Sequence, residues 1–165
     1  MERWFHELRE PVIRYLRSMG CRHFVAEDIS QEVFLRLHRA MADGLRVKDV
    51  RAWVFRVARN LYIDSRREDH RYSSGSMDGV LSETAYAPAV SGPEQAMLER
   101  ERIRTIQREI SRLPDLQREC MHLRAEGLRY HEIASVLDIP MTAAVDCVRQ
   151  ALKRLRRRFQ AELTS

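Results

Sequence analysis

The chain contains 165 residues, of which 44% are hydrophobic and 32% are charged. This length suits one ordinary domain or two small ones, and the globular balance of residues excludes a wholly disordered chain. The formal net charge is +5, and lysine occurs only at Lys48 and Lys153, so arginine dominates the basic residues. This balance permits binding to nucleic acid or another acidic surface. It does not establish such binding, because codon bias in the genome also produces a predominance of arginine over lysine.

The three cysteines, Cys21, Cys120 and Cys147, are far apart and odd in number. They indicate no disulfide framework, and we interpret them as small apolar residues of the interior. Cys21 and His23 alone do not make a zinc site of the usual four-ligand kind. No run is long and apolar enough to cross a membrane, and the charged, amphipathic N-terminus is not a secretory signal. We therefore expect a cytoplasmic protein without membrane insertion, metal or other cofactor.

A change of composition divides the chain into two blocks. Residues 72–95 contain no lysine or arginine and are rich in Ser, Gly, Ala and Pro. The stretch lacks helical periodicity, which favours a flexible linker. We therefore predict one domain over residues 1–71, a linker over 72–95 and a second domain over 96–165.

The first block carries three amphipathic helical patterns, in which apolar residues recur at three- and four-residue steps. In chain order these are Phe5, Leu8, Val12 and Leu16; Ile29, Val33, Leu37 and Met41; and Val50, Trp53, Val57 and Leu61. Gly20 and Gly44 are placed to end the first two helices. No β-type alternation of useful length appears, which favours an all-α fold.

The second block continues the helical pattern in shorter pieces. The first two stripes are Ile103, Ile106, Ile110 and Leu113, closed by Pro114, and Leu116, Cys120 and Leu123, closed at Gly127. Ile133 and Leu137 then lie on one short helix, and residues 138–140 make a turn. A longer helix follows over about residues 141–159. Its expected inward positions are Ala144, Val148, Leu152, Leu155 and Phe159.

Residues 130–155 have the spacing of a helix–turn–helix: a short helix, a tight turn and a second helix that can enter the major groove. Ala134 suits the close contact between the two helices. The polar face of the second helix offers Arg and Gln side chains for base edges and further cations for phosphates. The alternative is an ordinary helical hairpin with a solvated, charged face.

The segment AEDISQEVFLRLHRA, residues 26–40, has an acidic start that suits the positive end of a helix dipole. Its inner face consists of Ile29, Val33 and Leu37. Phe34 and Leu35 lie off that face, where a partner protein would find apolar contacts among acidic and amide side chains. The alternative is that both residues belong to the core of a small domain.

The segment VRAWVFRVARNLYIDSRRE, residues 50–68, places Trp53 and Phe55 among several arginines. Aromatic rings and cations together suit single-stranded DNA, because bases stack on the rings and phosphates are neutralised. Trp53 falls on the apolar stripe, so we expect it mainly to pack. The alternative is a core helix with solvated charges.

A catalytic site is not indicated. The six glycines stand singly, so there is no Gly-rich phosphate loop, and no Ser, His and Asp arrangement is suggested by spacing. Glu27 and Asp28 are adjacent and therefore point in different directions on a helix. We expect a protein that is not an enzyme.

Taken together, these segments resemble the extracytoplasmic-function (ECF) class of the sigma-70 family. Residues 26–40 resemble the polymerase-binding helix of that family, and residues 50–68 resemble its promoter-melting and −10-reading helix. LPDLQRECMHLRAEGLRYHEIASVLDIP, residues 113–140, resembles its −35-reading domain. The resemblance covers both blocks in the family's order. It implies a transcription initiation factor with two helical domains, sigma-2-like and sigma-4-like, that brings core RNA polymerase to specific promoters.

The resemblance also implies partners and site residues. The partners are core polymerase, through its β′ clamp helices and β flap, promoter DNA and an anti-sigma factor. The residues that would contact the clamp helices are Asp28, Gln31, Glu32, Phe34 and Leu35. The loop over residues 43–49 would hold a base flipped out of the −10 element, at a cost in unstacking that its pocket must offset. The residues for melting and −10 binding are Lys48, Trp53, Arg56, Arg59, Asn60, Arg66 and Arg67. Those for the −35 duplex are Thr142, Arg149, Gln150, Lys153 and Arg154.

The start of the expected recognition helix departs from the family's pattern. The usual cationic run is replaced by Val145, Asp146 and Cys147, and Asp146 is expected to repel phosphate. Base contacts are therefore expected to shift to Thr142, Arg149 and Gln150, with Lys153 and Arg154 on the DNA backbone. A second departure is Asp138, which stands at a turn position where Gly is common but which Asp tolerates.

Two other functions fit parts of the sequence. A dimeric helix–turn–helix regulator that binds duplex DNA without joining polymerase would need only the second block. A pure interaction protein, such as a decoy bound to an anti-sigma partner, would need no melting residues. The first block argues against the regulator, and the arginines of residues 56–67 argue against the decoy.

Overall fold

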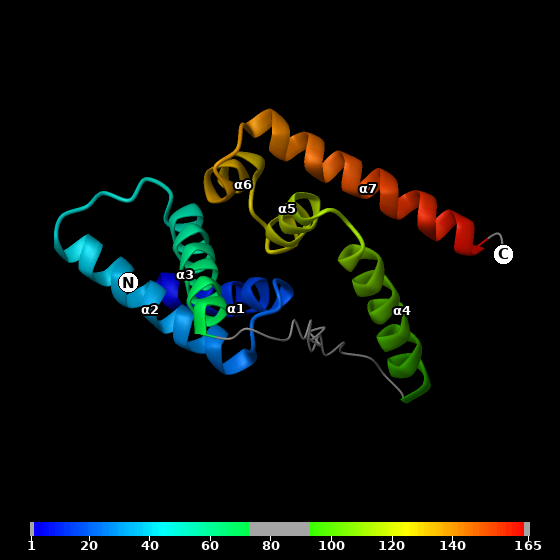
Figure 1. Ribbon diagram of the computed structural model, residues 1–165, viewed down its shortest axis with the longest axis horizontal. Helices are drawn as coiled ribbons and strands as arrows, with labels where there is room; N and C mark the ends of the chain where they lie inside the picture. Colours follow the sequence, from blue (N-terminus) through cyan, green and yellow to red (C-terminus); the bar gives the residue numbers. More distant parts are fainter. Residues whose placement is uncertain (1, 73–92, 164–165) are drawn as a thin grey trace.

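The computed structural model of the chain describes residues 2–72 and 93–163. Within these ranges it consists of seven α-helices and contains no strand, which confirms the predicted all-α fold (Figure 1). The first block holds α1 (Glu2–Ser18), α2 (His23–Ala42) and α3 (Val50–Tyr72). The second holds α4 (Pro93–Ser111), α5 (Asp115–Ala125), α6 (Tyr130–Leu137) and α7 (Met141–Leu163). The linker predicted over 72–95 lies outside the described residues except at its ends, where α3 reaches Tyr72 and α4 begins at Pro93.

The helix ends follow local backbone chemistry. Gly20 adopts a φ of 91° directly after α1, and its N–H donates to the Arg17 carbonyl at 2.9 Å. A left-handed residue of this kind closes a helix and is readily supplied by glycine. Asp138 closes α6 in the same region, with φ 54° and ψ 50°. Asp therefore takes the turn position, as predicted.

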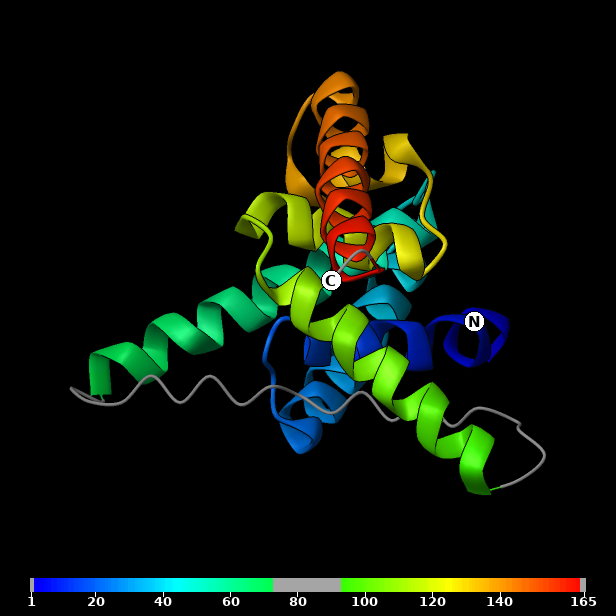
Figure 2. The same ribbon diagram turned by 90° about the vertical axis from the view of Figure 1, so that its right-hand side faces the viewer.

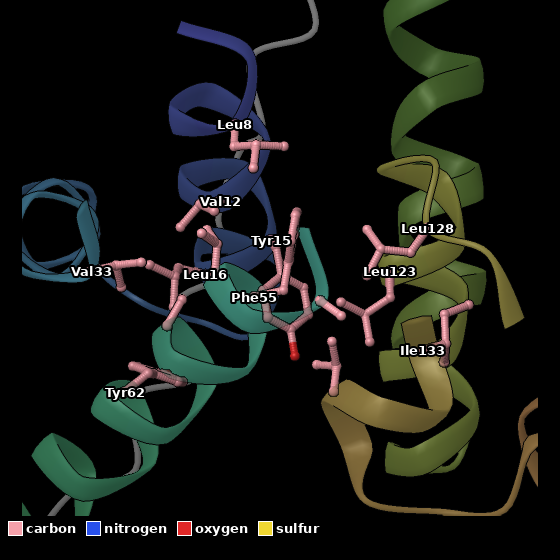
Figure 3. Packing of buried hydrophobic residues seen from close by; sticks show 14 of the residues in the cluster. Leu8, Val12, Tyr15, Leu16, Val33, Phe55, Tyr62, Leu123, Leu128 and Ile133 are labelled. Atoms are coloured by element: carbon pink, nitrogen blue, oxygen red, sulfur yellow. The ribbon is translucent and has the colours of Figure 1, made fainter. Parts of the chain in front are cut away.

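The apolar stripes of the first block meet in its centre (Figure 3). Leu8, Val12 and Leu16 of α1 are fully buried, as are Val33 of α2 and Phe55 of α3. The three helices pack against one another in every pairing. Burial of such side chains stabilises the fold by about 1.5–3 kcal/mol each. Three predicted helices thus form one bundle.

The same apolar cluster continues into the second block. Leu123 and Leu128, around the end of α5, and Ile133 of α6 lie in the cluster that contains Tyr15 and Phe55 (Figure 3). The Tyr15 and Phe55 rings are 5.5 Å apart between centroids. α6 packs on α3 and α5 touches α1. The two blocks, although separate in sequence, are therefore joined by a shared hydrophobic core in this structure.

Two of the cysteines take part in this core. Cys21 and Cys120 are buried, Cys147 is partly buried, and all three thiols are free. Burial raises the pKa of Cys21 to about 11 and that of Cys120 to about 12, so neither thiol is ionised near neutral pH. Their interpretation as small apolar residues is confirmed.

The second block is organised around α7, on which α5 and α6 pack. α4 joins α7 through a smaller cluster in which Leu113, Ala151 and Leu155 are buried. The buried carboxylate of Glu109 accepts from Arg112 at 2.6 Å and from Arg158 of α7 at 2.7 Å. Figure 2 shows α4 leading away from the packed centre, and most of its described side chains are exposed or partly exposed.

Three apolar stripe positions predicted in the second block, Ile106, Leu116 and Leu152, are exposed rather than buried. Leu152 is 42% exposed, and Ala151 is buried instead. Ala151 continues the spacing of Ala144, Val148 and Leu155 on one side of the helix, whereas Leu152 is turned to the edge of that stripe. Leu116 is likewise exposed, and its neighbour Gln117 faces inward. In both cases the contact with the neighbouring helix, rather than apolarity alone, decides which residue is buried.

Candidate nucleic-acid and partner interfaces

The polar side of α2 is open to solvent. Asp28, Gln31 and Leu35 are exposed, and they share one side because they are three and four residues apart. Leu35 keeps half of its surface accessible. Glu32 lies beside them and pairs with Arg36 at 2.7 Å within the helix. Four of the five predicted polymerase-binding residues therefore lie on the surface.

Phe34 does not lie there. Its side chain is only 6% exposed and meets the ring of Phe5 of α1 edge-on, with the ring centroids 5.1 Å apart. The expectation that Phe34 is offered to a partner is wrong in this structure, and the alternative that it belongs to the core is correct. Edge-to-face aromatic pairs of this kind stabilise packing beyond the area that they bury.

A different phenylalanine extends the open side of α2. Phe24 is 56% exposed, and it precedes Asp28, Gln31 and Leu35 by four, seven and eleven residues, which is the repeat of one helix face. The Arg22 guanidinium lies 4.8 Å from its ring centroid. We call Phe24, Asp28, Gln31 and Leu35 the outer face of α2. Phe24 lies two residues before the segment 26–40, and extending the helical spacing four residues upstream of Asp28 finds it in the sequence.

The predicted melting residues are spread along α3 and the loop before it. Lys48, Arg56 and Asn60 are exposed. Arg66 lies over the Tyr62 ring at 6.0 Å, and Arg67 pairs with Asp64 at 3.7 Å on the exposed side of the helix. Trp53 is partly buried against the shared core, as expected.

Arg59 differs from the other cations of α3, because it contacts the second block. Its Nε donates to Glu119 of α5 at 3.0 Å, and both side chains are largely covered. Nearby, Arg14 of α1 donates to both oxygens of Glu126 at 2.6 and 3.0 Å. Arg51 donates to the Glu126 carbonyl at 3.5 Å. Basic residues of the first block thus meet Glu119 within α5 and Glu126 at its C-terminal end.

A groove of about 300 Å³ lies beside these contacts, between α3 and α5. Arg66 and Arg67 line one side, and Arg118 and His122 line the other. Burial lowers the pKa of His122 to about 4, and the positive charge of Arg118 acts in the same direction. His122 is therefore neutral near physiological pH, and the groove's arginines share it with the carboxylates of Asp115 and Glu119, which also line it.

The helix–turn–helix geometry predicted in the second block is present. Ala134 is buried where α6 approaches α7, and the Ile139 N–H returns to the Ala134 carbonyl at 3.1 Å. The buried Glu132 carboxylate accepts the Arg129 N–H at 2.5 Å, which caps the start of α6. The start of α6 and the turn after it are thus each held by a hydrogen bond, and α7 begins at Met141 directly after the turn.

All five predicted −35 residues lie on the exposed side of α7: Thr142, Arg149, Gln150, Lys153 and Arg154. Two of them are held by neighbours. Arg149 donates to Asp146 at 2.7 Å, and Gln150 accepts from Gln117 of α5 at 3.0 Å. Asp146 therefore screens one of the cations that remain on this part of the helix.

The comparisons with known proteins decide the family. The family model Sigma-70 region 2 matches residues 4–72, and that of Sigma-70, region 4 matches residues 103–159. The RNA polymerase sigma-H factor of Pseudomonas aeruginosa is 30% identical over 150 residues, which cover 82% of this chain and 72% of that protein. The chain belongs to the sigma-70 family.

Further relatives specify the class. The ECF RNA polymerase sigma factor SigW of Bacillus subtilis is 29% identical over 87% of this chain and 80% of its own length. Escherichia coli ECF sigma-E is 29% identical over 84% of this chain and 73% of its own length. This sigma factor therefore belongs to the ECF class and acts in transcription initiation. The regulator and decoy alternatives are not retained, because the matches cover both blocks.

Solved structures agree in fold. The sigma factor RpoE of Bartonella quintana, solved with the anti-sigma factor NepR, gives a TM-score of 0.68 at 22% identity, over 97% of this chain and 98% of that one. CnrH, solved with the cytosolic domain of CnrY, gives 0.59 at 23% identity over 98% and 90%. These likenesses support the two-domain helical fold of this sigma factor.

The family to which the chain belongs consists of sigma factors, which are not enzymes. Over residues 2–72 and 93–163, no group of three or more His, Cys, Asp or Glu side chains is placed to hold a metal ion. In the same part of the chain, no helix combines the length and apolarity needed to span a bilayer.

Proposed function

We propose that this sigma factor docks on core RNA polymerase through the outer face of α2. The observation that carries the proposal is one open helix side on which two exposed apolar residues, Phe24 and Leu35, flank the polar residues Asp28 and Gln31. Apolar anchors surrounded by polar groups suit a protein interface, because the apolar area is removed from water while the rim fixes orientation. The polymerase element that we assign to it is the β′ clamp helices.

We assign to Phe24 the aromatic contact with polymerase that the sequence suggested for Phe34. Phe24 is large, aromatic and open to solvent, and residues of this type contribute most to the energy of interfaces. Arg22 stacks on it and leaves one edge of the ring accessible. We propose Phe24 and Leu35 as the two apolar anchors, with Asp28, Gln31 and Glu32 between and beside them.

We propose that promoter DNA is bound by both blocks. Lys48, Arg56, Asn60, Arg66 and Arg67, with Arg59 once it is released from Glu119, would hold the separated −10 strand. The loop over residues 43–49 would receive an unstacked base. The outward side of α7 would enter the major groove of the −35 duplex. Binding of the open strand favours melting, because a ligand shifts an equilibrium toward the state that it binds.

We also propose an anti-sigma factor as a regulatory partner. The support is the Bartonella sigma factor of similar fold, which was solved with such a factor. The groove between α3 and α5 and the open surface of α4 are the parts of this chain that a partner spanning both blocks would reach.

The docking proposal is tested by the affinity of the purified protein for core polymerase. Leu35→Ala removes one anchor, and Met41→Ala is a matched control, because Met41 is an exposed apolar residue of α2 that lies off its outer face. We expect Leu35→Ala to weaken binding roughly tenfold, in keeping with the loss of a central apolar contact, and Met41→Ala to leave it unchanged. Equal affinities for wild type and Leu35→Ala, with both proteins folded by circular dichroism, would refute the proposal.

A further inference from the structure

Gln117 is a polar residue in an apolar position. It lies on the side of α5 that faces α7, in line with the buried residues Leu113 and Cys120, and it is only 7% exposed. Leu116, next to it, is turned out to solvent. The orientation is the reverse of what burial alone would select, because the apolar neighbour is outside and the amide is inside.

The amide of Gln117 makes one side-chain hydrogen bond. Its Nε2 donates to Oε1 of Gln150 at 3.0 Å, whereas its own Oε1 is buried without a hydrogen-bond partner. An unpaired buried carbonyl is unfavourable, and an apolar side chain at this position would avoid that cost. Packing alone therefore does not account for an amide at position 117. The hydrogen bond of Gln117 holds the exposed side chain of Gln150 on α7.

This hydrogen bond changes what Gln150 can offer to DNA. A glutamine reads adenine through two simultaneous contacts, in which Oε1 accepts from N6 and Nε2 donates to N7. In this structure Oε1 of Gln150 accepts from Gln117, which turns that oxygen toward α5 and leaves the Nε2 hydrogens as the groups offered to DNA. Such a donor matches the N7 and O6 acceptors of guanine or the O4 acceptor of thymine, whereas in adenine it finds the N7 acceptor beside the N6 amino group, which is itself a donor.

We infer that Gln117 is a positioning residue for base recognition: by holding Oε1 of Gln150, it makes one position of the −35 element a guanine or thymine rather than an adenine. The inference rests on the proposed reading of the −35 duplex by α7. Gln117 touches no base itself, and it acts through the orientation of the Gln150 amide.

The test uses holoenzyme assembled from the full chain and core polymerase, with transcription from a promoter library randomised in the −10 and −35 elements. Gln117→Met keeps the length of the side chain and removes the amide, and Gln117→Leu is a second variant for the same purpose. In each, Oε1 of Gln150 is free. We expect adenine to rise on the order of fivefold relative to guanine and thymine at one −35 position, while the other positions keep their preferences. Gln150→Ala should abolish the preference at that same position.

The outcomes separate this inference from the proposed function. A loss of packing would lower transcription from all promoters alike and leave base preferences unmoved, which would overturn the positioning role. If Gln150→Ala alters the base preference at the −35 position and neither Gln117 variant does, the positioning role of Gln117 is overturned as well. If the double variant Lys153→Ala, Arg154→Ala transcribes the library with the same −35 preferences and yield as wild type, the proposed −35 reading itself fails.

Discussion

Nε of Arg59 lies 3.0 Å from a carboxylate oxygen of Glu119, so a cation of the helix that we assign to promoter melting is paired with an anion of the block that we assign to the −35 duplex. The two residues are 60 positions apart in sequence. Each side chain is about one-quarter exposed, so the pair is partly shielded from solvent and from salt. The position of the second block therefore determines whether Arg59 is free to contact DNA.

The first prediction concerns this link. Glu119→Gln removes the charge and keeps the shape, and it should weaken the contact between the blocks by about 1 kcal/mol, the value typical of a partly exposed pair. The released Arg59 should then raise the affinity of the free protein for a single-stranded −10 oligonucleotide severalfold, as measured by fluorescence anisotropy at low salt.

Asp115→Asn is the matched control for this measurement. Asp115 also lies in α5, but it pairs with Arg118 of the same helix at 2.5 Å. An equal gain in affinity in both variants would mean that general loss of negative charge, rather than release of Arg59, is responsible. No gain in either would show that Arg59 contributes nothing to strand binding.

The second prediction separates two phenylalanines of α2. Phe24→Ala should leave the free energy of unfolding almost unchanged and weaken core polymerase binding, because Phe24 is exposed on the outer face of α2. Phe34→Ala should lower the free energy of unfolding by about 3 kcal/mol or more, because it removes a buried ring that packs on Phe5. Urea titration and a polymerase-binding assay on the same protein preparations give both quantities. The reverse pattern would place Phe34 at the interface.

The division of roles on α2 shows how far the sequence alone reaches. Spacing predicted the helix and its polar side, since both depend on a local repeat. It named Phe34 and not Phe24 as the exposed aromatic residue, because the burial of Phe34 depends on Phe5, which lies in another helix. The same holds for Gln117, whose inward orientation is set by α7.

The contact between the two blocks was left open by the sequence for a related reason. Arg59 and Glu119 each look like ordinary solvated charges on amphipathic helices, and no local pattern connects them. The five residues that the family resemblance implied for the −35 duplex, in contrast, share one side of a single helix, and all of them are exposed. Local periodicity therefore predicted which side chains lie on the surface of each helix. Which of them are covered by the other block depends on tertiary packing.

The third prediction is a dependence of stability on pH through His122. Burial lowers its pKa in the folded protein to about 4, from an ordinary value of 6.5. Below pH 6.5 the unfolded chain therefore binds a proton that the folded chain does not bind, so stability is complete above pH 6.5 and falls as the pH drops toward 4. The contribution of this residue across the window is about 3 kcal/mol.

His122→Gln isolates this contribution, since glutamine stays neutral throughout. Between pH 7 and pH 5 the wild type should lose about 2 kcal/mol more of its unfolding free energy in urea than the variant does. His38→Gln is the control, because His38 lies on the exposed side of α2. A pH profile that is the same in wild type and in His122→Gln would show that His122 is not held neutral by the fold.

The fourth prediction concerns Asp146, which departs from the cationic pattern of its family and pairs with Arg149 at 2.7 Å. In the free protein this carboxylate neutralises a cation at the surface that we assign to the −35 duplex, and near DNA it would also repel phosphate. Asp146→Ala should therefore free Arg149 and strengthen binding of the holoenzyme to −35 duplex DNA. Because one further phosphate contact releases about one more counterion, the slope of log affinity against log salt should steepen by roughly 0.9.

Asp28→Ala, which removes an exposed acid of the first block, controls for the overall change in net charge. If the slope steepens equally in both variants, the effect belongs to net charge. If it steepens only in Asp146→Ala, Asp146 restrains the recognition helix, and the chain discriminates among promoters with fewer phosphate contacts than its arginine content suggests.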